Sequence, residues 1–501
     1  MLKRIVIGVA LAFAILVLSC KYLLPERFAV NAPVGRMLFG WAGEIPVAAE
    51  IRKRLHVPPG FSIGIYAEGI QSSARFLRFT EAGDLLVSTP RSGGIVLLER
   101  DSDGDGRADG MRVLLSGLNR PHGIELREGW LYIGETDAIA RIRFDAASGQ
   151  LDGELERIVT GLPGGGNHWA KTLRFGPDTW LYMHAGSSCN VCVEDDERRA
   201  TIMRFRPDGS SGQIYATGLR NSVGFDWHPV TGDLYATDNG RDLLGDNFPP
   251  CELNKIVEGG FYGWPLANGN RVPDPDFGAG QETRIAASIP PSHPFRAHNA
   301  PLGITFVRGD QVPAEYRQAA LVALHGSWNR SKKDGYKVVS LHWEPDGSIR
   351  EQDFATGFEI DEDVIGRPVD VAEGPDGAFY ISDDYAGAIW RVAYGEEAAG
   401  GQSPSATSRR PDPLATLPSS ERFRLSRAGE LLYERFACAT CHEPASAGPG
   451  IAVKRLEKLD RRYTIDSLSL LLETPPQPMP TYPLDPEQRR SLAVHLLETR
   501  R

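Results

Sequence analysis

The sequence has no excess of positive charge. Its 55 lysine and arginine residues are outnumbered by 65 aspartate and glutamate residues, and the formal net charge at pH 7 is -10. This balance argues against nucleic acid as the partner. Hydrophobic residues make up 41% of the 501 positions and charged residues 24%, which is ordinary for a globular protein and allows two or three domains.

Long apolar runs are also scarce, and the only extended one stands at the start, from Ile5 to Leu18, after two basic residues. It is too short for a comfortable membrane span and fits an export signal over residues 1–20. The sequence "VLSC" also resembles a bacterial lipoprotein cleavage box in which Cys20 would be acylated, although Leu18 fits that box poorly. An uncleaved anchor or ordinary cleavage are the alternatives. We expect a bacterial protein in the periplasm, or one anchored in the membrane and facing the periplasm.

Cysteine is rare, with six residues in the chain. Two of them stand in "FACATCHEP", where Cys438 and Cys441 are spaced to form thioethers with a porphyrin and His442 follows as the proximal iron ligand. A thiol pair or half of a zinc site is the alternative, but a zinc site needs a second pair of ligands nearby, and none follows. The motif therefore predicts covalently bound haem c.

The residues around this motif predict a small helical haem domain. Met479 in "PPQPMPTYP" follows at a suitable distance to be the second axial ligand of the iron, and a thioether raises the haem potential. His495 is the competing ligand, but it fits better on the face of the closing helix. Helical patterns bracket the motif, and residues 421–501 resemble a class I cytochrome c domain.

The remaining cysteines have less defined roles. Cys189 and Cys192 in "SSCNVC" could pair with each other, which would leave Cys251 single. Two free thiols are the alternative, but export and haem attachment both place the chain in an oxidising compartment.

Short strand-like segments recur between residues 57 and 395. "WLYIGE", "WLYMHA", "DLYATD", "AALVALH" and "AFYISD" share one pattern, and "DLLVST" is a weaker first copy. Each has further strands around it, so that about six copies of four short strands describe a six-bladed β-propeller. The last copy lacks its fourth strand, and "FSIGIYAEGI" near the start is expected to supply it. Residues 21–56 are then an N-terminal extension and residues 396–420 a flexible linker. The expected fold is thus mainly β, followed by a small all-α cytochrome c domain.

Propeller topology places one set of loops on one face of the ring. The loop before the first strand and the loop after the second strand of each blade meet there. These polar residues could simply be turn residues on a solvated face. However, six loops that are distant in the sequence bring cations and hydrogen-bonding groups to one axis, which suits a ligand with several carboxylates. The residues before the first strands are Arg75, His122, His168, Arg220, Asn221, His298, Asn299 and Arg367.

The propeller resembles the soluble quinoprotein glucose/sorbosone dehydrogenase family, whose members bind pyrroloquinoline quinone (PQQ) and calcium. The resemblance rests on "GGGNHWAKTLRFGPDTWLYMHAGSSCN", "GLRNSVGFDWHPVTGDLYATDNGRDLLGDNFPPCELN", "GGFYGWP", "HGSWNRSKKDGYKVV" and "GRPVDVAEGPDGAFYISDD", which span the whole propeller. It implies that His168 is the catalytic base and that Arg220 and Asn221 contact the cofactor.

The same resemblance assigns further positions. Gly240 and Arg241 match the residues whose backbone carbonyls hold calcium, and Arg367 matches an arginine that contacts PQQ. Arg330 and Lys337 are weaker choices for the positive charge near the quinone.

The chemistry of PQQ supports these roles. PQQ is an ortho-quinone with three carboxylates, so cationic side chains hold its acids while a neutral histidine takes the proton of a substrate hydroxyl. Where the aldose-oxidising branch of the family has an aspartate, this chain has Gly186, Ser187 and Ser188. The sequence is closer to the sorbosone and pyranose branch, and glucose should not be assumed as the substrate.

We therefore expect a PQQ-dependent dehydrogenase of a sugar, polyol, alcohol or aldehyde that passes electrons through its own haem to a soluble cytochrome or a quinone-linked respiratory protein. Two alternatives remain at this stage. One is an anchored propeller that docks a separate dehydrogenase while its haem relays electrons. The other is a lactonase-type propeller hydrolase, which has no need of a haem.

Overall fold

The structure is a computed structural model that describes residues 47–70, 74–395, 413–414, 417–443, 456, 459, 463–473, 475 and 479–499. The predicted export signal with Cys20, most of the N-terminal extension and most of the linker lie outside these residues. None of the helices within the described ranges combines the length and apolar character needed to cross a membrane.

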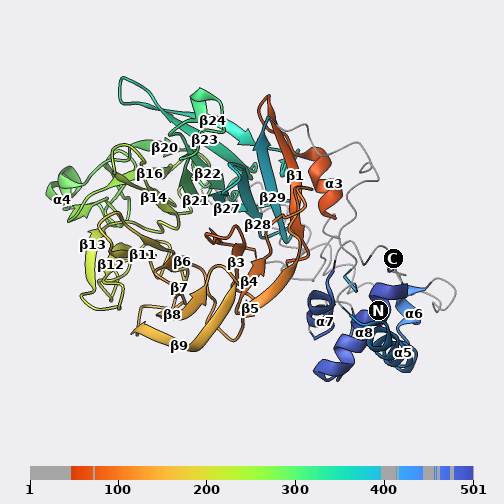
Figure 1. Ribbon diagram of the computed structural model, residues 1–501. Helices are drawn as coiled ribbons and strands as arrows, with labels where there is room; N and C mark the ends of the chain where they lie inside the picture. Colours follow the sequence, from red (N-terminus) through yellow and green to blue (C-terminus); the bar gives the residue numbers. More distant parts are fainter. Residues whose placement is uncertain are drawn as a thin grey trace, which may run out of the picture.

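Six antiparallel sheets surround a common axis, and together they form the predicted six-bladed propeller (Figure 1). Blade 1 consists of β2 (Leu77–Phe79), β3 (Leu85–Thr89), β4 (Gly94–Leu98) and β5 (Met111–Leu115). Blade 2 consists of β6 (Ile124–Arg127), β7 (Trp130–Gly134), β8 (Ala138–Asp145) and β9 (Gln150–Thr160). Blade 3 consists of β10 (Leu173–Phe175), β11 (Leu181–Ala185), β12 (Thr201–Phe205) and β13 (Gln213–Thr217), with β17 (Gly260–Phe261) added in parallel.

The other three blades follow the same order. Blade 4 consists of β14 (Phe225–Trp227), β15 (Leu234–Asp238), β16 (Cys251–Ile256) and β20 (His293–Phe295). Blade 5 consists of β21 (Pro301–Phe306), β22 (Ala320–Leu324), β23 (Lys337–Trp343) and β24 (Ile349–Ala355). Blade 6 consists of β27 (Pro368–Glu373), β28 (Phe379–Asp383), β29 (Ala388–Tyr394) and β1 (Phe61–Glu68).

The first strand of the chain closes the ring, as the sequence predicted. β1 pairs antiparallel with β29, from Phe61 opposite Tyr394 to Glu68 opposite Ala388. The two ends of the propeller sequence therefore share one sheet. This closure leaves no unpaired blade at which the ring could open.

Burial explains why these segments are strands. All five positions of β3, β11, β15, β22 and β28, the second strands of their blades, are buried, because neighbouring blades cover both faces. The outer strand β9 alternates between exposed and half-buried positions. The core is accordingly divided into clusters between adjacent blades, such as the one that joins Leu85 and Val87 of blade 1 to Ile389 of blade 6.

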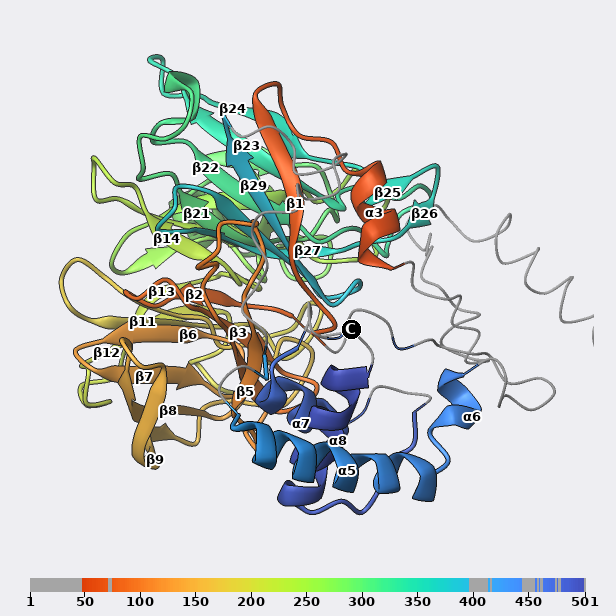
Figure 2. The same ribbon diagram turned by 45° about the vertical axis from the view of Figure 1, so that its right-hand side comes forward.

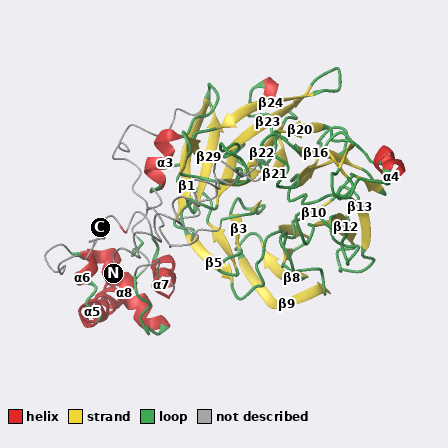
Figure 3. Cartoon of the chain, turned by 180° about the vertical axis from the view of Figure 1, so that it is seen from behind, coloured by secondary structure: helices red, strands yellow, loops and turns green. Residues whose placement is uncertain are grey.

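A few short elements decorate the ring. They are α3 (Ala48–Arg54), β18 (Ala267–Asn268), β19 (Val272–Pro273), α4 (Glu282–Ala287), η2 (Ala314–Tyr316), β25 (Glu359–Ile360) and β26 (Asp363–Val364). Helix α3 packs Ala48 and Ile51 into the core between blades 5 and 6. Viewed from behind, α4 lies at the periphery of the ring, far from the C-terminal helices (Figure 3).

The C-terminal region forms a separate helical cluster beside the propeller, with α7 in contact with β5 of blade 1 (Figures 1 and 2). Its helices are α5 (Ser419–Arg435), α6 (Ala439–His442), α7 (Ile465–Glu473) and α8 (Pro486–Thr499). Helices α5 and α8 cross closely at Gly429, where an added Cβ would lie 2.2 Å from the carbonyl oxygen of Ser491. His495 is buried in this crossing beside Tyr433, with ring centroids 5.8 Å apart. His495 therefore belongs to the helix interface, as the sequence indicated.

Candidate active site

His168 stands on one rim of the propeller, in the loop before β10, and its ring is fixed by Ser187. His168 Nδ1 lies 3.0 Å from the carbonyl oxygen of Ser187 and 2.9 Å from Ser187 Oγ. The hydroxyl group of Ser187 donates its hydrogen to the carbonyl oxygen of Cys189, at 2.8 Å. Both oxygens can therefore only accept from the imidazole, so Nδ1 carries the hydrogen and Nε2 keeps a lone pair. Burial and the charge of Arg220 lower the pKa of His168 to about 3, which keeps the ring neutral.

Arg220 and Asn221 lie next to His168. Asp238, at the end of β15, accepts the backbone N–H groups of Arg220 at 3.0 Å and of Asn221 at 2.5 Å, which fixes the turn that carries both side chains. The backbone N–H of Ser187 donates to the carbonyl of Arg220 at 2.8 Å. Ser187 thus contacts both His168 and Arg220, and the structure brings three of the predicted site residues together.

Gly186 explains how His168 and Asn221 can approach each other. A Cβ added to Gly186 would lie 2.5 Å from His168 Cβ and 2.7 Å from Asn221 Oδ1. Both distances are shorter than real Cβ contacts, so no larger residue fits without moving one of the two side chains. Arg199 donates to the Gly186 carbonyl at 3.2 Å and holds the strand end in place.

The predicted calcium position is occupied in part by Arg220. Arg220 Nη1 donates to the carbonyl oxygen of Gly240 at 3.0 Å, which leaves one lone pair of that oxygen for a cation. The side chain of Arg241 turns away to form ion pairs with buried Asp274 and exposed Asp276, at 2.7 and 3.0 Å. Asp242, which is 3.1 Å from Arg220 Nη2, supplies a negative charge at the same place.

Arg367 belongs to a second cluster, on blades 5, 6 and 1. Arg367 Nη2 donates to His325 Nδ1 at 2.9 Å, and His325 Nε2 donates to Asp384 at 3.0 Å. Arg75 donates to the other oxygen of Asp384 at 2.8 Å. Burial and Arg367 lower the pKa of His325 to about 4, so the ring is neutral. Arg75 and Arg367 thus lie on the same rim beside Asp384 and Asp383, whose carboxylate accepts the backbone N–H of Arg367 at 2.9 Å.

The last two predicted cations differ in placement. Arg330 is buried against the loop that follows Arg241, where Arg330 Nη1 donates to the carbonyls of Asp246 and Ala297. Lys337 begins β23 and directs its ammonium group to Asp353 on β24, the outermost strand of blade 5, at 2.5 Å. Lys337 is thus paired at the outer part of the blade and not with His168 or Arg220.

Unpaired polar atoms on the rim show that the residues present suit an acidic, polar ligand. Among the described residues, buried nitrogen and oxygen atoms with no hydrogen-bond partner include Arg75 Nε, Arg367 Nε, Asn221 Oδ1, His298 Nδ1 and Asn299 Oδ1. Buried polar atoms are normally satisfied, so such a concentration at one rim indicates a ligand or water molecules. Carboxylate and quinone oxygens would accept from the two arginine N–H groups, whereas the two asparagine oxygens need an N–H or O–H donor or a cation.

A cavity of about 490 Å³ lies at the opposite end of the innermost strands and is a poor candidate for the site. Arg308 in its lining already forms a two-pronged ion pair with Asp226, with contacts of 2.8 and 2.9 Å. It also lacks every residue predicted for the site.

The C-terminal cluster contains the residues predicted to attach haem. Cys438 is buried, Cys441 is exposed, and both are free thiols. His442 ends α6, and Met479 and Tyr482 pack against the same hydrophobic cluster as Cys438. Both thiols are therefore available for thioether bonds next to an apolar wall, which fits a haem group.

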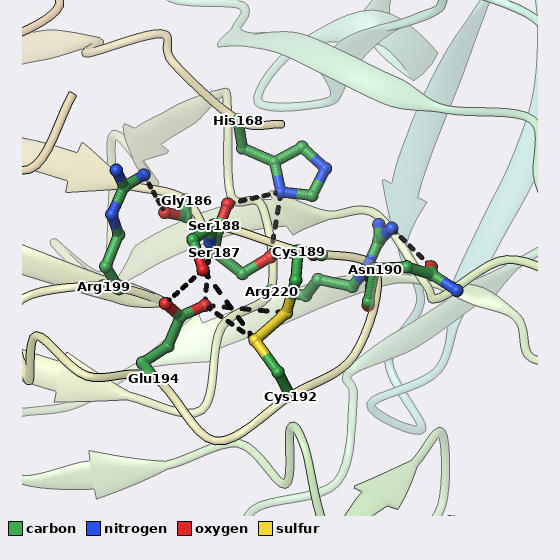
Figure 4. Close-up of a disulfide and its surroundings, with 10 residues drawn as sticks. All are labelled: His168, Gly186, Ser187, Ser188, Cys189, Asn190, Cys192, Glu194, Arg199 and Arg220. Atoms are coloured by element: carbon green, nitrogen blue, oxygen red, sulfur yellow. Dashed lines mark hydrogen bonds between the residues drawn. A yellow bond between two sulfur atoms is a disulfide. The ribbon is translucent and has the colours of Figure 1, made fainter. Parts of the chain in front are cut away.

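Three contributors escaped the sequence prediction. Asn190 binds Arg220, His325 binds Arg367, and Asp384 binds His325. The signals were the quoted motifs "SSCNVC", "HGSWNRSKKDGYKVV" and "GRPVDVAEGPDGAFYISDD", which contain these residues without revealing their partners. The predicted pairing of Cys189 with Cys192 is confirmed (Figure 4).

Comparison with solved structures shows the same fold in PQQ-dependent sugar dehydrogenases. The holo form of the pyranose dehydrogenase PQQ domain from Coprinopsis cinerea is 21% identical, with a TM-score of 0.58, and the match covers 68% of this chain and 97% of that one. A calcium structure of a Trichoderma reesei enzyme of carbohydrate-active family AA12 is 20% identical, with a TM-score of 0.60 and coverage of 68% and 97%. At these identities the likeness shows the propeller fold.

Sequence comparison finds relatives that are 25% to 30% identical to this chain. The PQQ-dependent pyranose dehydrogenase of Coprinopsis cinerea is 25% identical over 421 residues, which covers 69% of this chain and 56% of that protein. An uncharacterized protein of Borreliella burgdorferi is 30% identical over 363 residues, which covers 69% of this chain and 93% of the relative. Residues 48–398, the whole propeller, match the family described as "Domain of unknown function (DUF7133)", and the chain belongs to that family.

Proposed function

We propose that the protein is a PQQ-dependent dehydrogenase that oxidises a hydroxyl group of a sugar, with related polyols, alcohols or aldehydes as further substrates. The observation that carries the proposal is the neutral imidazole of His168, whose Nδ1–H is bound by Ser187 and whose pKa is lowered by burial and by the charge of Arg220. The shared fold and the similarity to a PQQ-dependent pyranose dehydrogenase support the same function.

The chain's own residues would bind the cofactor and move one proton. PQQ, when bound, supplies the electron-accepting quinone. Arg367 and Arg75 would hold carboxylates of PQQ, and Arg220 and Asn221 would orient the PQQ ring system next to His168. Calcium would take the free lone pair of the Gly240 carbonyl and the neighbouring carbonyl of Arg241. His168 Nε2 would accept the proton of the substrate hydroxyl, while Ser187 keeps the ring in the correct orientation.

The proposal includes the haem and the location. Cys438 and Cys441 would bind haem c, and His442 and Met479 would ligate its iron. Because haem c is attached outside the cytoplasm, we propose a periplasmic protein or one held at the membrane by its N-terminus. A soluble cytochrome or a quinone-linked respiratory protein would then take the electrons.

An absorbance spectrum of the purified, haem-loaded protein tests this function. PQQ, calcium and a panel of pyranoses, polyols and aldehydes are added singly and together. The reduced c-type α-band should grow only when cofactor, metal and substrate are all present. If dithionite reduces the haem but no member of the panel does, the proposed dehydrogenase activity is wrong.

Replacement of Gly186 by alanine tests the placement of the base. The new Cβ would displace His168 or Asn221, because it would lie 2.5 and 2.7 Å from their atoms. A shift of about 1 Å in a catalytic group can cost about 10²-fold, so kcat should fall by that order while the melting temperature changes by only a few degrees. Gly165→Ala is the matched control, since nothing lies within 4 Å of its added Cβ. Equal kcat in both variants would contradict the proposed position of His168.

A further inference from the structure

The disulfide between Cys189 and Cys192 closes a ring of four residues directly beside the candidate site (Figure 4). The loop that contains it follows β11 and also carries Gly186 and Ser187. Glu194 fixes the base of this ring, because the backbone N–H and the hydroxyl of Ser188 each donate to its carboxylate at 2.7 Å. The loop is therefore held at two places, by a covalent bond and by a carboxylate.

Asn190, inside this ring, binds the guanidinium group of Arg220. Arg220 Nε donates to the backbone carbonyl of Asn190 at 2.8 Å, and Arg220 Nη2 donates to Asn190 Oδ1 at 2.9 Å. Arginine has five N–H donors in a rigid fork, and two of them end on this one residue. Figure 4 shows the two side chains next to each other, with His168 above them.

Asn190 also binds the segment that carries the predicted calcium carbonyls. The backbone N–H of Asp242 donates to Asn190 Oδ1 at 2.8 Å, and Asn190 Nδ2 donates to the carbonyl of Asp242 at 3.1 Å. These two bonds imitate the pairing of two backbone strands. One amide side chain of blade 3 thus joins Arg220, in the turn that enters blade 4, to the loop of residues 239–242 on blade 4.

A general stabilising role for the ring would not need these contacts. Val191 occupies the same ring, and among the described residues its side chain makes no polar contact. Asn190, by contrast, satisfies four polar groups, and every one of them belongs to Arg220 or Asp242. The specificity of these bonds distinguishes a residue that orients the site from one that only fills a loop.

We propose that Asn190 is a positioning residue, which the Cys189–Cys192 ring holds so that it orients Arg220 and the 239–242 segment. Its effect on the cofactor rests on the proposed function, in which Arg220 contacts PQQ. Its effect on the segment is independent of that function, because the bonds to Asp242 are present without any ligand. Removal of a residue that hydrogen-bonds to a ligand-binding group and orients it typically lowers affinity or activity 10- to 100-fold.

The test uses the full, haem-loaded chain and four variants: Asn190→Ala, Asn190→Asp, Cys189→Ser/Cys192→Ser and the matched control Val191→Ala. The first readout is amide hydrogen exchange of residues 238–243 before any PQQ is added. The second is the dissociation constant of PQQ with calcium, from quenching of tryptophan fluorescence, together with kcat and KM.

In Asn190→Ala the Asp242 amide should exchange at least tenfold faster, and PQQ should bind about 10- to 100-fold more weakly. Asn190→Asp keeps the acceptor for Arg220 and for the Asp242 amide, so it should lie closer to the parent protein than Asn190→Ala in both readouts. The double serine variant should resemble Asn190→Ala, and Val191→Ala should resemble the parent.

Unchanged exchange in Asn190→Ala, or an equal change in Val191→Ala, would overturn the proposal. If Asn190→Ala does not fold, the double serine variant decides through the same exchange measurement. Failure of the parent protein to bind PQQ would instead count against the proposed function, and the exchange rates would still decide the role of Asn190.

Discussion

Replacing His168 with glutamine should lower kcat for sugar oxidation by about 10²- to 10⁴-fold, because general base catalysis contributes about that much. Glutamine can still accept or donate a hydrogen bond beside Ser187, but it cannot take up a proton at neutral pH. The rim should keep its fold, since the contacts of Arg220 and Asn221 with Asp238 do not involve the imidazole. Steady-state rates of the loaded enzyme, with PQQ affinity measured in parallel, provide the check.

His342→Gln is the matched control. His342 is a buried histidine of β23 whose Nδ1 lies 2.8 Å from the carbonyl of Glu315 and whose Nε2 lies 2.9 Å from Ser340 Oγ. Both ring nitrogens are engaged within blade 5, so this variant should keep kcat while it loses a little stability. A similar loss of kcat in the two variants would show that general damage to the propeller, and not loss of a base, causes the effect.

The pH dependence of the reaction tests the protonation state of His168. In the proposed reaction His168 acts as the neutral base, and burial and Arg220 lower its pKa to about 3, from an ordinary value of 6.5. A base with a lowered pKa loses activity only when the pH falls through that lower value. Burial is the larger cause and persists when the site is filled, so kcat/KM should stay level from pH 8 down to below 6.5. An acid limb centred at 6.5 would contradict a buried, neutral His168.

The propeller could be predicted from the sequence because its signal is repeated. Each blade needs a second strand that is buried on both faces, so segments such as Leu181–Ala185 and Phe379–Asp383 keep the same apolar pattern. The closing strand β1 was predictable for the same reason, since the last copy lacked one strand. The strand pattern is weak in any one blade, but its recurrence in several blades makes the prediction firm.

The contacts of the site could not be predicted, because they depend on loop conformation. Asn190 acquires its role from a disulfide-closed turn and from Asp242, which lies on another blade. Lys337 stands in a motif that resembles the family, yet its side chain reaches the outer strand, because the register of β23 sets its direction. Arg241 was assigned for its carbonyl alone, and the buried ion pair of its side chain had no local signal.

Replacement of both Cys438 and Cys441 by serine should abolish the c-type absorbance of the protein and its reduction by substrate. A thioether needs a sulfur atom, and serine cannot provide one. The propeller should be unaffected, since these cysteines belong to the hydrophobic cluster of the C-terminal helices. Cys251→Ala is the control, because Cys251 is a buried free thiol of β16 in blade 4 and its loss should leave the haem spectrum intact.

The Cys438→Ser/Cys441→Ser variant also separates the oxidation of the sugar from the transfer of electrons to the acceptor. Oxidation of a sugar hydroxyl releases two electrons, and a haem takes one at a time, so in the proposed reaction the haem would be a relay and not the site of oxidation. With an artificial dye that accepts electrons directly from the propeller, the variant should keep sugar oxidation within a few-fold of the parent rate. With a soluble cytochrome as acceptor, its rate should fall to background. Normal cytochrome reduction without the haem would show that electrons leave the propeller by another path, and the haem relay would have to be abandoned.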